Sequence, residues 1–440
     1  MALTGRTGLL AAVGALAVLF APQPGAAVLG LLLLLAALVT VDLLLAGAVR
    51  PLRLERSGER RVRLGDSVEV VLTVENPGRR RVRGRLRDAW SPSARAKPRE
   101  QPLDVPAGER RRVVTTLVPL RRGDRESAGV TIRSVGPLGL AARQGSHAVP
   151  WAVRVLPPFL SRTHLPAKLS RLRELEGRNP VLIRGQGTEF DSLREYVAGD
   201  DVRSIDWRAT ARRSDVVVRT WRPERDRRVL IVLDTSRTSA GRVGVDPASG
   251  DPSGWPRLDW SLDAALLLAA LATRAGDRVD FLAHDRAVRA WVTGASRTEL
   301  LSVLVDTMAP IEAELIEADS ESMVTAIMAR ASHRCLVVLL TDLNPAAMEE
   351  GLLPVLPQLA SRHLVLLAAV SDPRVAAMAE GRETLEQVYD AAAAEHLRGE
   401  RRRMTSRLRS HGVEVVDALP EQLAPALADA YLALKAAGRL

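Results

Sequence analysis

Side chains that carry oxygen gather after two apolar segments of this 440-residue chain. Asp234, Ser236 and Thr238 lie in "DTSRT" directly after "RVLIVL", and Asp342 follows "CLVVLLT". In parallel sheets, ligands bind beyond the carboxyl ends of the strands, where such residues would meet. Hydroxyls and carboxylates together suit a hard cation such as Mg²⁺, and neutral hydroxyls leave it positive charge with which to hold another molecule's carboxylate. In the alternative interpretation, Asp234 and Ser236 only cap the turn.

A second candidate site lies between Thr188 and Trp221, where acidic and basic residues alternate. Asp200, Asp201 and Asp206 could hold a metal ion or act as acid and base in a metal-dependent hydrolase. Because this segment contains no histidine or cysteine, we favour a network of ion pairs that docks it onto the sheet beside Asp234. The expected network consists of Arg194, Arg203 and Arg212 holding Glu189, Asp201 and Asp206, with Tyr196 and Trp207 as aromatic anchors.

The overall composition restricts the class of protein. The formal net charge is +10, but 52 acidic residues are interleaved with the basic ones and aromatic residues make up only 3%. Binding of single-stranded nucleic acid relies on aromatic platforms, so we expect a membrane-facing basic protein and no nucleic-acid partner. The single cysteine, Cys335, excludes an intrachain disulfide.

The first 50 residues are predicted to enter a membrane. The apolar runs 8–20 and 26–49 are separated by "PQPG", and a spanning helix needs about 20 such residues. Arginines precede and follow the pair, which predicts a helical hairpin with both ends in the cytoplasm. The first run could instead be a signal peptide, which leaves the remainder cytosolic. Asp42 is either a functional carboxylate in the membrane or a residue near the interface without a special role.

Three further parts follow the hairpin. Residues 51–160 alternate apolar and polar positions between Gly/Pro turns, as in "SVEVVLTVENPG", which predicts an immunoglobulin-like β-sandwich. Residues 161–226 are predicted to be a linker. In residues 227–440 strands alternate with helices and several strands are wholly apolar, which predicts a Rossmann-like α/β domain with a parallel-rich sheet covered on both faces.

The pattern "DTSRT" with a later "TD" resembles the metal-ion-dependent adhesion site of von Willebrand factor type A domains. Asp234, Ser236 and Asp342 match that site directly, and Thr238 replaces its final serine. The family also uses a threonine on a separate loop. This chain reads "EADSESMVT" there, so Ser320 is the expected substitute.

The segment from Gly187 to Arg212 resembles the signature of the domain of unknown function 58 family. The matching residues are Gly187, Glu189, Phe190, Leu193, Arg194, Tyr196, Gly199, Asp200, Asp201, Arg203, Ile205, Asp206, Trp207, Thr210, Ala211 and Arg212. The resemblance implies a bacterial protein of the inner membrane that carries a type A domain and works beside a MoxR-type AAA+ ATPase and its client. It implies no enzymatic activity.

These observations lead to one main expectation and two alternatives. The main expectation is a non-enzymatic, multi-pass membrane adaptor that binds a partner carboxylate through Mg²⁺ held by Asp234, Ser236, Thr238, Ser320 and Asp342. The alternatives are the metal-dependent hydrolase and a metal-free scaffold.

Overall fold

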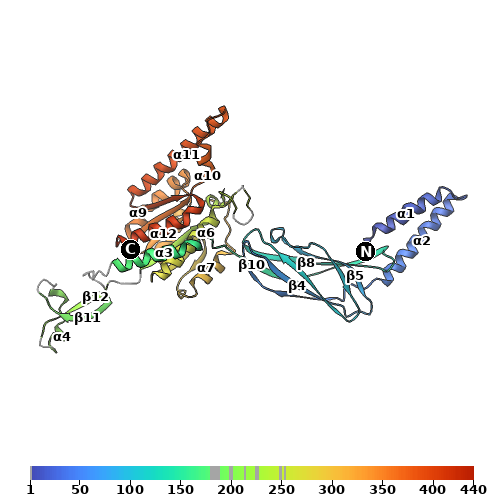
Figure 1. The fold of residues 1–440 in the computed structure, drawn as a ribbon, viewed down its shortest axis with the longest axis horizontal. Helices are drawn as coiled ribbons and strands as arrows, with labels where there is room; N and C mark the ends of the chain where they lie inside the picture. The colour runs from blue at the N-terminus through green and yellow to red at the C-terminus, as the bar shows by residue number, and fades with distance from the viewer. Residues whose placement is uncertain are drawn as a thin grey trace. The chain divides into compact units, whose positions relative to one another are not determined.

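The computed structural model describes residues 2–178, 189–197, 202–212, 215–222, 227–246, 250–251 and 254–440. The chain divides into two compact units, Met1–Pro158 and Phe159–Leu440 (Figure 1). Each unit is described by itself below.

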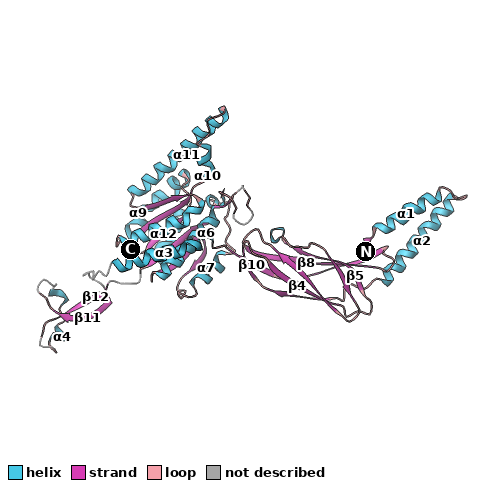
Figure 2. Cartoon of the chain, in the orientation of Figure 1, coloured by secondary structure: helices cyan, strands magenta, loops and turns pink. Residues whose placement is uncertain are grey.

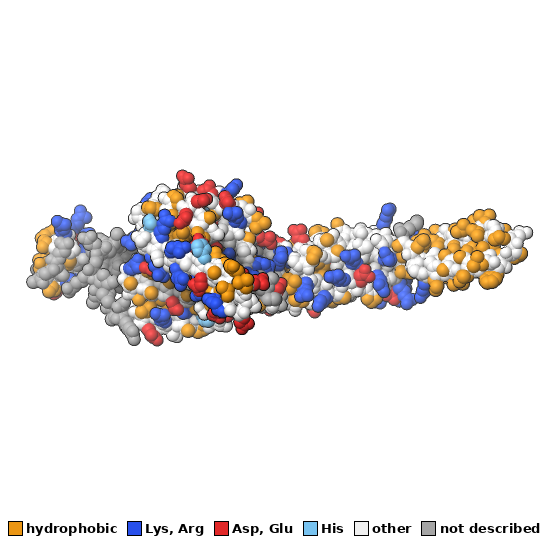
Figure 3. All heavy atoms as spheres, turned by 90° about the horizontal axis from the view of Figure 1, so that it is seen from above, with side chains coloured by type: hydrophobic (Ala, Val, Ile, Leu, Met, Phe, Trp, Pro, Cys, Tyr) orange, Lys and Arg blue, Asp and Glu red, His pale blue; other side chains and the backbone are white. Residues whose placement is uncertain are grey.

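Two apolar helices open the first unit. They are α1 (Gly5–Val18) and α2 (Pro24–Leu45), and they lie side by side (Figure 1). Among the described residues, α2 is the one helix long and apolar enough to cross a membrane. Gly14 allows the helices to pack closely, because a Cβ atom there would lie 2.4 Å from Leu31 Cδ1. Apolar side chains cover the outside of this pair (Figure 3), a surface suited to lipid.

Asp42 joins the end of α2 to the β-strands of the same unit. Its carboxylate is fully buried and accepts backbone N–H bonds from Leu138 and Leu140 at 2.7 Å each and from Ala141 at 2.8 Å. Gly136 leaves the necessary space, since a Cβ atom there would lie 2.2 Å from Asp42 Oδ1. Asp42 therefore has a structural role, which neither sequence-based interpretation foresaw.

The rest of the first unit consists of two sheets that pack against each other. The smaller sheet has the order β2 (Arg53–Gly58), β4 (Val68–Glu75), β7 (Arg110–Leu117). The larger sheet contains β1 (Ala2–Leu3), β3 (Arg61–Arg63), β5 (Val82–Trp90), β6 (Gln101–Val105), β8 (Gly123–Val135), β9 (Ala141–His147) and β10 (Ala152–Leu156). One core joins them, with Leu72 from the smaller sheet and Leu86 and Ile132 from the larger. The predicted two-sheet packing is confirmed.

The second unit is built on a sheet that Figure 2 draws in magenta among cyan helices. The sheet has six strands in the order β17-β16-β13-β18-β19-β20. Its strands are β13 (Arg228–Asp234), β16 (Arg278–His284), β17 (Val288–Val292), β18 (Leu336–Leu340), β19 (Leu364–Val370) and β20 (Glu414–Ala418). All neighbours are parallel except β17, which pairs antiparallel with β16. The central strands are buried along their length. This agrees with the predicted parallel-rich sheet covered on both faces.

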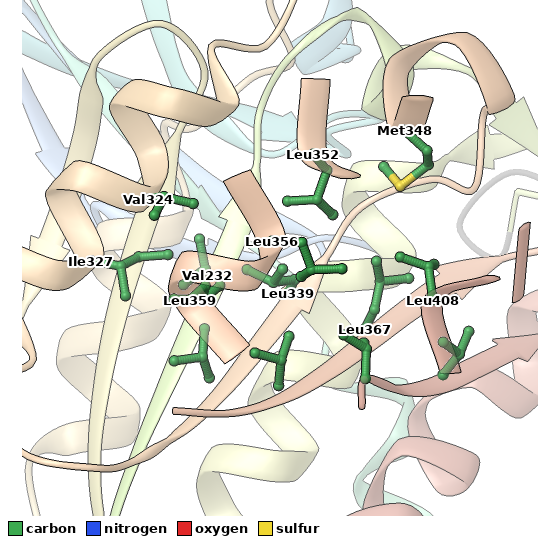
Figure 4. Close-up of a cluster of buried hydrophobic side chains, with 14 of the residues drawn as sticks. Val232, Val324, Ile327, Leu339, Met348, Leu352, Leu356, Leu359, Leu367 and Leu408 are labelled. Atoms are coloured by element: carbon green, nitrogen blue, oxygen red, sulfur yellow. The ribbon is translucent and has the colours of Figure 1, made fainter. Parts of the chain in front are cut away.

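Helices cover both faces of this sheet. On one face α8 (Ser320–Arg330), α9 (Leu353–Arg362) and α11 (Leu385–Ser410) enclose a core that includes Val232, Leu339 and Leu367 (Figure 4). On the other face α6 (Arg257–Arg274) packs against α12 (Pro420–Ala436). Alternate residues of a strand point to opposite faces, so the wholly apolar strands serve both layers.

Shorter elements complete the second unit. They include α3 (Leu165–Arg178), α5 (Arg237–Ala240), α7 (Leu300–Met308), α10 (Pro373–Met378), the π-helical turn η4 (Ala347–Leu352) and the β14–β15 pair (Arg242–Val243, Trp255–Pro256). Helix α3 belongs to the predicted linker, yet it packs against α6 and α12. Later in that segment β11 (Glu189–Glu195) and β12 (Val217–Arg222) form an antiparallel hairpin that carries α4 (Trp207–Thr210).

Candidate functional site at the carboxyl ends of two strands

The end of β13 carries a compact cluster of oxygen atoms. Asp234 Oδ1 accepts the backbone N–H of Ser236 at 2.8 Å, and Asp234 Oδ2 accepts the Thr238 hydroxyl at 2.9 Å. The Ser236 and Thr238 hydroxyls lie 3.1 Å apart. The structure thus brings together these three predicted residues. It also shows the contact of the alternative interpretation, in which Asp234 caps the turn by accepting the Ser236 N–H. The bound metal ion stays a prediction.

A fourth side chain in this cluster is that of Thr341, which sequence reasoning missed. Its hydroxyl follows β18 and donates to Asp234 Oδ2 at 2.7 Å. Ser320, the expected source of a separate hydroxyl, begins α8 and lines the same cavity. In the described hydrogen bonds it is not joined to the cluster. The signal for Thr341 was present in "LLTD", because parallel neighbours β13 and β18 end at the same edge.

Asp342 is placed differently from the prediction. Its carboxylate pairs with Arg401 at 2.9 Å and with Arg257 at 3.5 Å, and it is not among the residues lining the cavity. Arg401 also donates to Asp417 at 2.7 Å. Although burial alone would lower the pKa of Arg401, its hydrogen bond to Asp417 and the charge of Asp342 raise it above the usual value. The cluster therefore contains one carboxylate and three hydroxyls.

The cluster opens into a cavity of about 220 Å³. Acidic residues at its edge include Asp285, Glu317, Asp319 and Glu350, and apolar side chains from β13, β18, α8 and η4 form its walls. Within the described ranges, no group of three or more His, Cys, Asp or Glu side chains is placed to hold a metal ion. A cation here would therefore depend on the hydroxyls, which suits Mg²⁺ and not Zn²⁺.

His284 ends β16 directly beside Asp234 in the sheet and is 2% exposed. Its Nε2 lies 3.4 Å from the Ser322 hydroxyl. Burial lowers the pKa of His284, although the carboxylate of Asp285 acts in the opposite direction. The folded protein therefore favours neutral His284, as expected for a core histidine.

This pKa shift predicts a pH-dependent stability. The pKa of His284 is lower in the folded state than in the unfolded state. Neutral His284 therefore makes its full contribution to the free energy of unfolding above pH ~6.5, and this contribution is lost as the pH falls below that value. We expect His284→Gln to reduce the drop in Tm between pH 8 and pH 5.5 by about 2–4 °C. Thermal unfolding of both proteins at each pH measures this. Equal drops in both proteins would contradict the assignment. His396→Gln, at an exposed position in α11, is the control.

Asp206, in the segment with alternating charges, pairs with a different arginine from those predicted. Asp206 accepts the backbone N–H groups of Arg208 and Ala209 at 3.0 Å each, which caps α4. It pairs with Arg219 at 2.8 Å, and not with Arg194, Arg203 or Arg212 as expected. The hydrogen bond from Arg219 and that from the Ala209 N–H hold the pKa of Asp206 below its usual value.

Other residues of this segment fit the predicted network less directly. Tyr196 and Trp207, the expected anchors, are exposed. Asp200 and Asp201 lie outside the described residues, and Glu189 pairs through its backbone with Arg222 in the hairpin. The interactions seen here hold the hairpin together internally, through the Ile205–Val218 bridge among others. Docking onto the sheet beside Asp234 stays a prediction.

Comparison with known proteins identifies relatives of this chain. A family model described as "Protein of unknown function DUF58" matches residues 192–413. Uncharacterized proteins of Mycobacterium tuberculosis and Mycobacterium bovis are 29% identical over 204 residues, which is 46% of this chain and 60% of theirs. The match thus spans less than two thirds of the relatives' length.

The similarity to solved structures is low. The CARDB domain of the PF1109 protein from Pyrococcus furiosus is 14% identical, with 24% of this chain and 86% of that chain covered and a TM-score of 0.19. The minor pilin PilB from Streptococcus sanguinis is 9% identical, with coverage of 87% and 77% and a TM-score of 0.32. Neither score is high enough for a conclusion about fold.

Proposed function

This chain belongs to the DUF58 family of proteins of unknown function, and we propose its role from the candidate site. We propose that the protein is a membrane-anchored adaptor that binds a carboxylate of a protein partner. The observation that carries the proposal is the convergence of Asp234, Ser236, Thr238 and Thr341 at the ends of β13 and β18. This edge is where parallel sheets bind ligands. The strand order and the cluster together support a von Willebrand factor type A domain.

The residues present fit Mg²⁺ as the bound ion. Asp234, Ser236, Thr238 and Thr341 offer only oxygen, and three of the four donors are neutral. Such a set would leave positive charge on Mg²⁺ and an open position for an acidic group. Arg257 and Arg401 hold Asp342, which keeps a second carboxylate from cancelling that charge. Asp342 thus shapes the site in this proposal without binding the ion, and Ser320 borders it.

The proposed membrane anchor is based on helix α2, and the proposed partner is based on the family resemblance. Helix α2 supports attachment to the membrane, and the arginine distribution supports a multi-pass hairpin with both units in the cytoplasm. A MoxR-type AAA+ ATPase, or its client, is the proposed partner on the basis of the family resemblance.

The hydrolase alternative is less well supported by the described residues. Of its three carboxylates, Asp206 caps α4 and pairs with Arg219. A general base needs to reach the reacting proton, and an oxygen engaged in these contacts is poorly suited to that task. This favours the adaptor over the hydrolase.

Titration with Mg²⁺ tests the proposed function. We expect the full-length chain in detergent micelles to bind Mg²⁺, and Asp234→Asn to lower the affinity at least about tenfold because the only carboxylate of the cluster loses its charge. Isothermal titration calorimetry measures both. Asp372→Asn is a matched control, because Asp372 follows the neighbouring strand β19 and caps α10 outside the cluster. Equal heats for all three proteins, or none, would leave the metal-free scaffold as the function.

A further inference from the structure

The cavity beside the oxygen cluster has a second, apolar half. Val232, Leu339, Met348 and Leu352 line it and also belong to the buried core of this face (Figure 4). Met323 of α8 lines it as well and packs against the same core. A site that bound only a metal ion and a solvated carboxylate would have no use for this surface. Except for Met323, these side chains are almost fully buried, and the part that they turn to the cavity is apolar, as in most ligand pockets. It suits an apolar group of a ligand.

The wall of this apolar half has an unusual backbone. Residues Ala347–Leu352 form the π-helical turn η4, and five of these six line the cavity or its edge. Gly351 brings η4 close to α8, since a Cβ atom there would lie 3.0 Å from the Ser320 hydroxyl oxygen. π-helical turns are rare and occur frequently at functional sites. The backbone here is therefore shaped around the cavity.

The size of the cavity limits what can enter. Its volume of about 220 Å³ exceeds the about 150 Å³ of a dry cavity that holds benzene. The space therefore suits one apolar side chain with a carboxylate next to it.

Two of the four carboxylates at the edge of the cavity have an arginine partner among the described ion pairs. Arg237 lies 3.1 Å from Glu317, and Arg289 lies 3.1 Å from Asp285. Asp319 accepts the backbone N–H of Ser322 at the start of α8. These contacts reduce the repulsion that an incoming carboxylate meets, and a cation at Asp234 would attract it.

We propose that the cavity binds the C-terminal residue of a partner chain, with the terminal carboxylate at the oxygen cluster and a branched apolar side chain in the apolar half. This inference rests on the proposed function. It extends that function by naming the ligand class. In a C-terminal residue the carboxylate and the side chain are bonded to the same carbon atom, which matches the direct contact between the two halves of this small cavity. An aspartate or glutamate side chain has no apolar branch beside its carboxylate.

Three small probes separate the possible ligands. N-acetyl-leucine carries both groups, N-acetylglycine carries only the carboxylate, and leucinamide carries the side chain with a positive charge. With the full-length chain in micelles and saturating Mg²⁺, we expect N-acetyl-leucine to bind about ten- to a hundredfold more tightly than N-acetylglycine, because it buries the additional apolar group. Leucinamide is expected to show no binding. Calorimetry measures all three.

A variant with a bulkier side chain in the cavity tests where the leucine side chain of N-acetyl-leucine binds. Ala347→Phe introduces a large side chain on η4, the turn that also carries Met348 and Leu352. We expect it to abolish the preference for N-acetyl-leucine while Mg²⁺ still binds. If this variant does not fold, the affinities of the three probes for the unmodified chain test the proposal by themselves.

Each outcome bears on one of the two proposals. Equal binding of both acids, with Mg²⁺ binding intact, would overturn this inference and leave the proposed function standing. Tighter binding of leucinamide would also overturn it. Absence of Mg²⁺ binding would remove the proposed function and this inference with it.

Discussion

Replacing Arg401 with methionine is expected to destabilise the second unit by about 3 kcal/mol, because the buried carboxylate of Asp342 loses its nearer cation and keeps only Arg257 at 3.5 Å. Arg401 lies between Asp342 and Asp417, at 2.9 and 2.7 Å, and its side chain is 19% exposed. Methionine keeps an unbranched apolar stem close to that of arginine and removes the guanidinium group with its charge and donors. Thermal unfolding of the full-length chain should show a Tm lowered by on the order of 10 °C.

The neighbouring residue provides the matched control. Arg402 lies on the same helix and pairs with Glu395 at 3.5 Å, but its side chain is 70% exposed. Exposed ion pairs contribute about 1 kcal/mol or less, so Arg402→Met should lower the Tm little. The double variant Arg401→Met with Asp342→Asn should recover part of the lost stability, since the Asp342 carboxylate is then replaced by a neutral amide. Equal effects of the two single methionine variants would refute the argument.

Most of the second unit could be predicted from the sequence, because its strands are apolar along their whole length. Such strands are buried on both faces, and this predicts a parallel sheet between helical layers. The start of the unit is predicted to be a linker, although the sequence carries a signal for helix α3. Its leucines recur at the spacing of one helix face, at Leu165, Leu169, Leu172 and Leu175. The helix packs against α6 and α12, and the many charged residues between the leucines obscure this pattern.

The candidate site was predictable where its residues are close together in the sequence. Asp234, Ser236 and Thr238 lie within one turn, and their contacts follow from local geometry. Thr341 was missed because resemblance to a family directed attention to Ser320. The pairing of Asp342 with Arg401 joins residues 59 positions apart. No spacing rule predicts which of many arginines in a basic helix turns toward the sheet.

The charged segment illustrates the same limit. The sequence showed that acids and bases alternate, which favours ion pairs, but not which residues pair. The Ile205–Val218 bridge and the hydrogen bond from the Asp206 N–H to the Val217 carbonyl place Asp206 beside β12. Arg219 of that strand is therefore its partner. Asp206 also uses its carboxylate to cap α4, a contact that its position directly before "WRAT" makes possible.

The membrane end contains the other carboxylate whose role only the structure reveals. Asp42 lies in α2, and the loop that it binds is almost a hundred residues later in the chain, as the 96-residue separation from Leu138 shows. Three backbone N–H groups point at one buried carboxylate. Arg143 adds a contact in the same region by donating to the Leu43 carbonyl at 2.9 Å. The end of the apolar helix is therefore attached to the β-strands by hydrogen bonds as well as by the chain itself.

Asp42→Asn is expected to loosen this attachment, because an amide has one accepting oxygen where the carboxylate has two. We expect the local opening free energy to fall by about 2–3 kcal/mol, so that hydrogen exchange at Leu138, Leu140 and Ala141 accelerates about thirty- to a hundredfold. Exchange of the full-length chain in micelles, followed by mass spectrometry, measures this. Thr40→Val is the matched control, since the Thr40 hydroxyl donates only within α2, to the Ala36 carbonyl. Unchanged exchange in Asp42→Asn would show that contacts other than this carboxylate hold the loop, and that the helix end is fixed by packing alone.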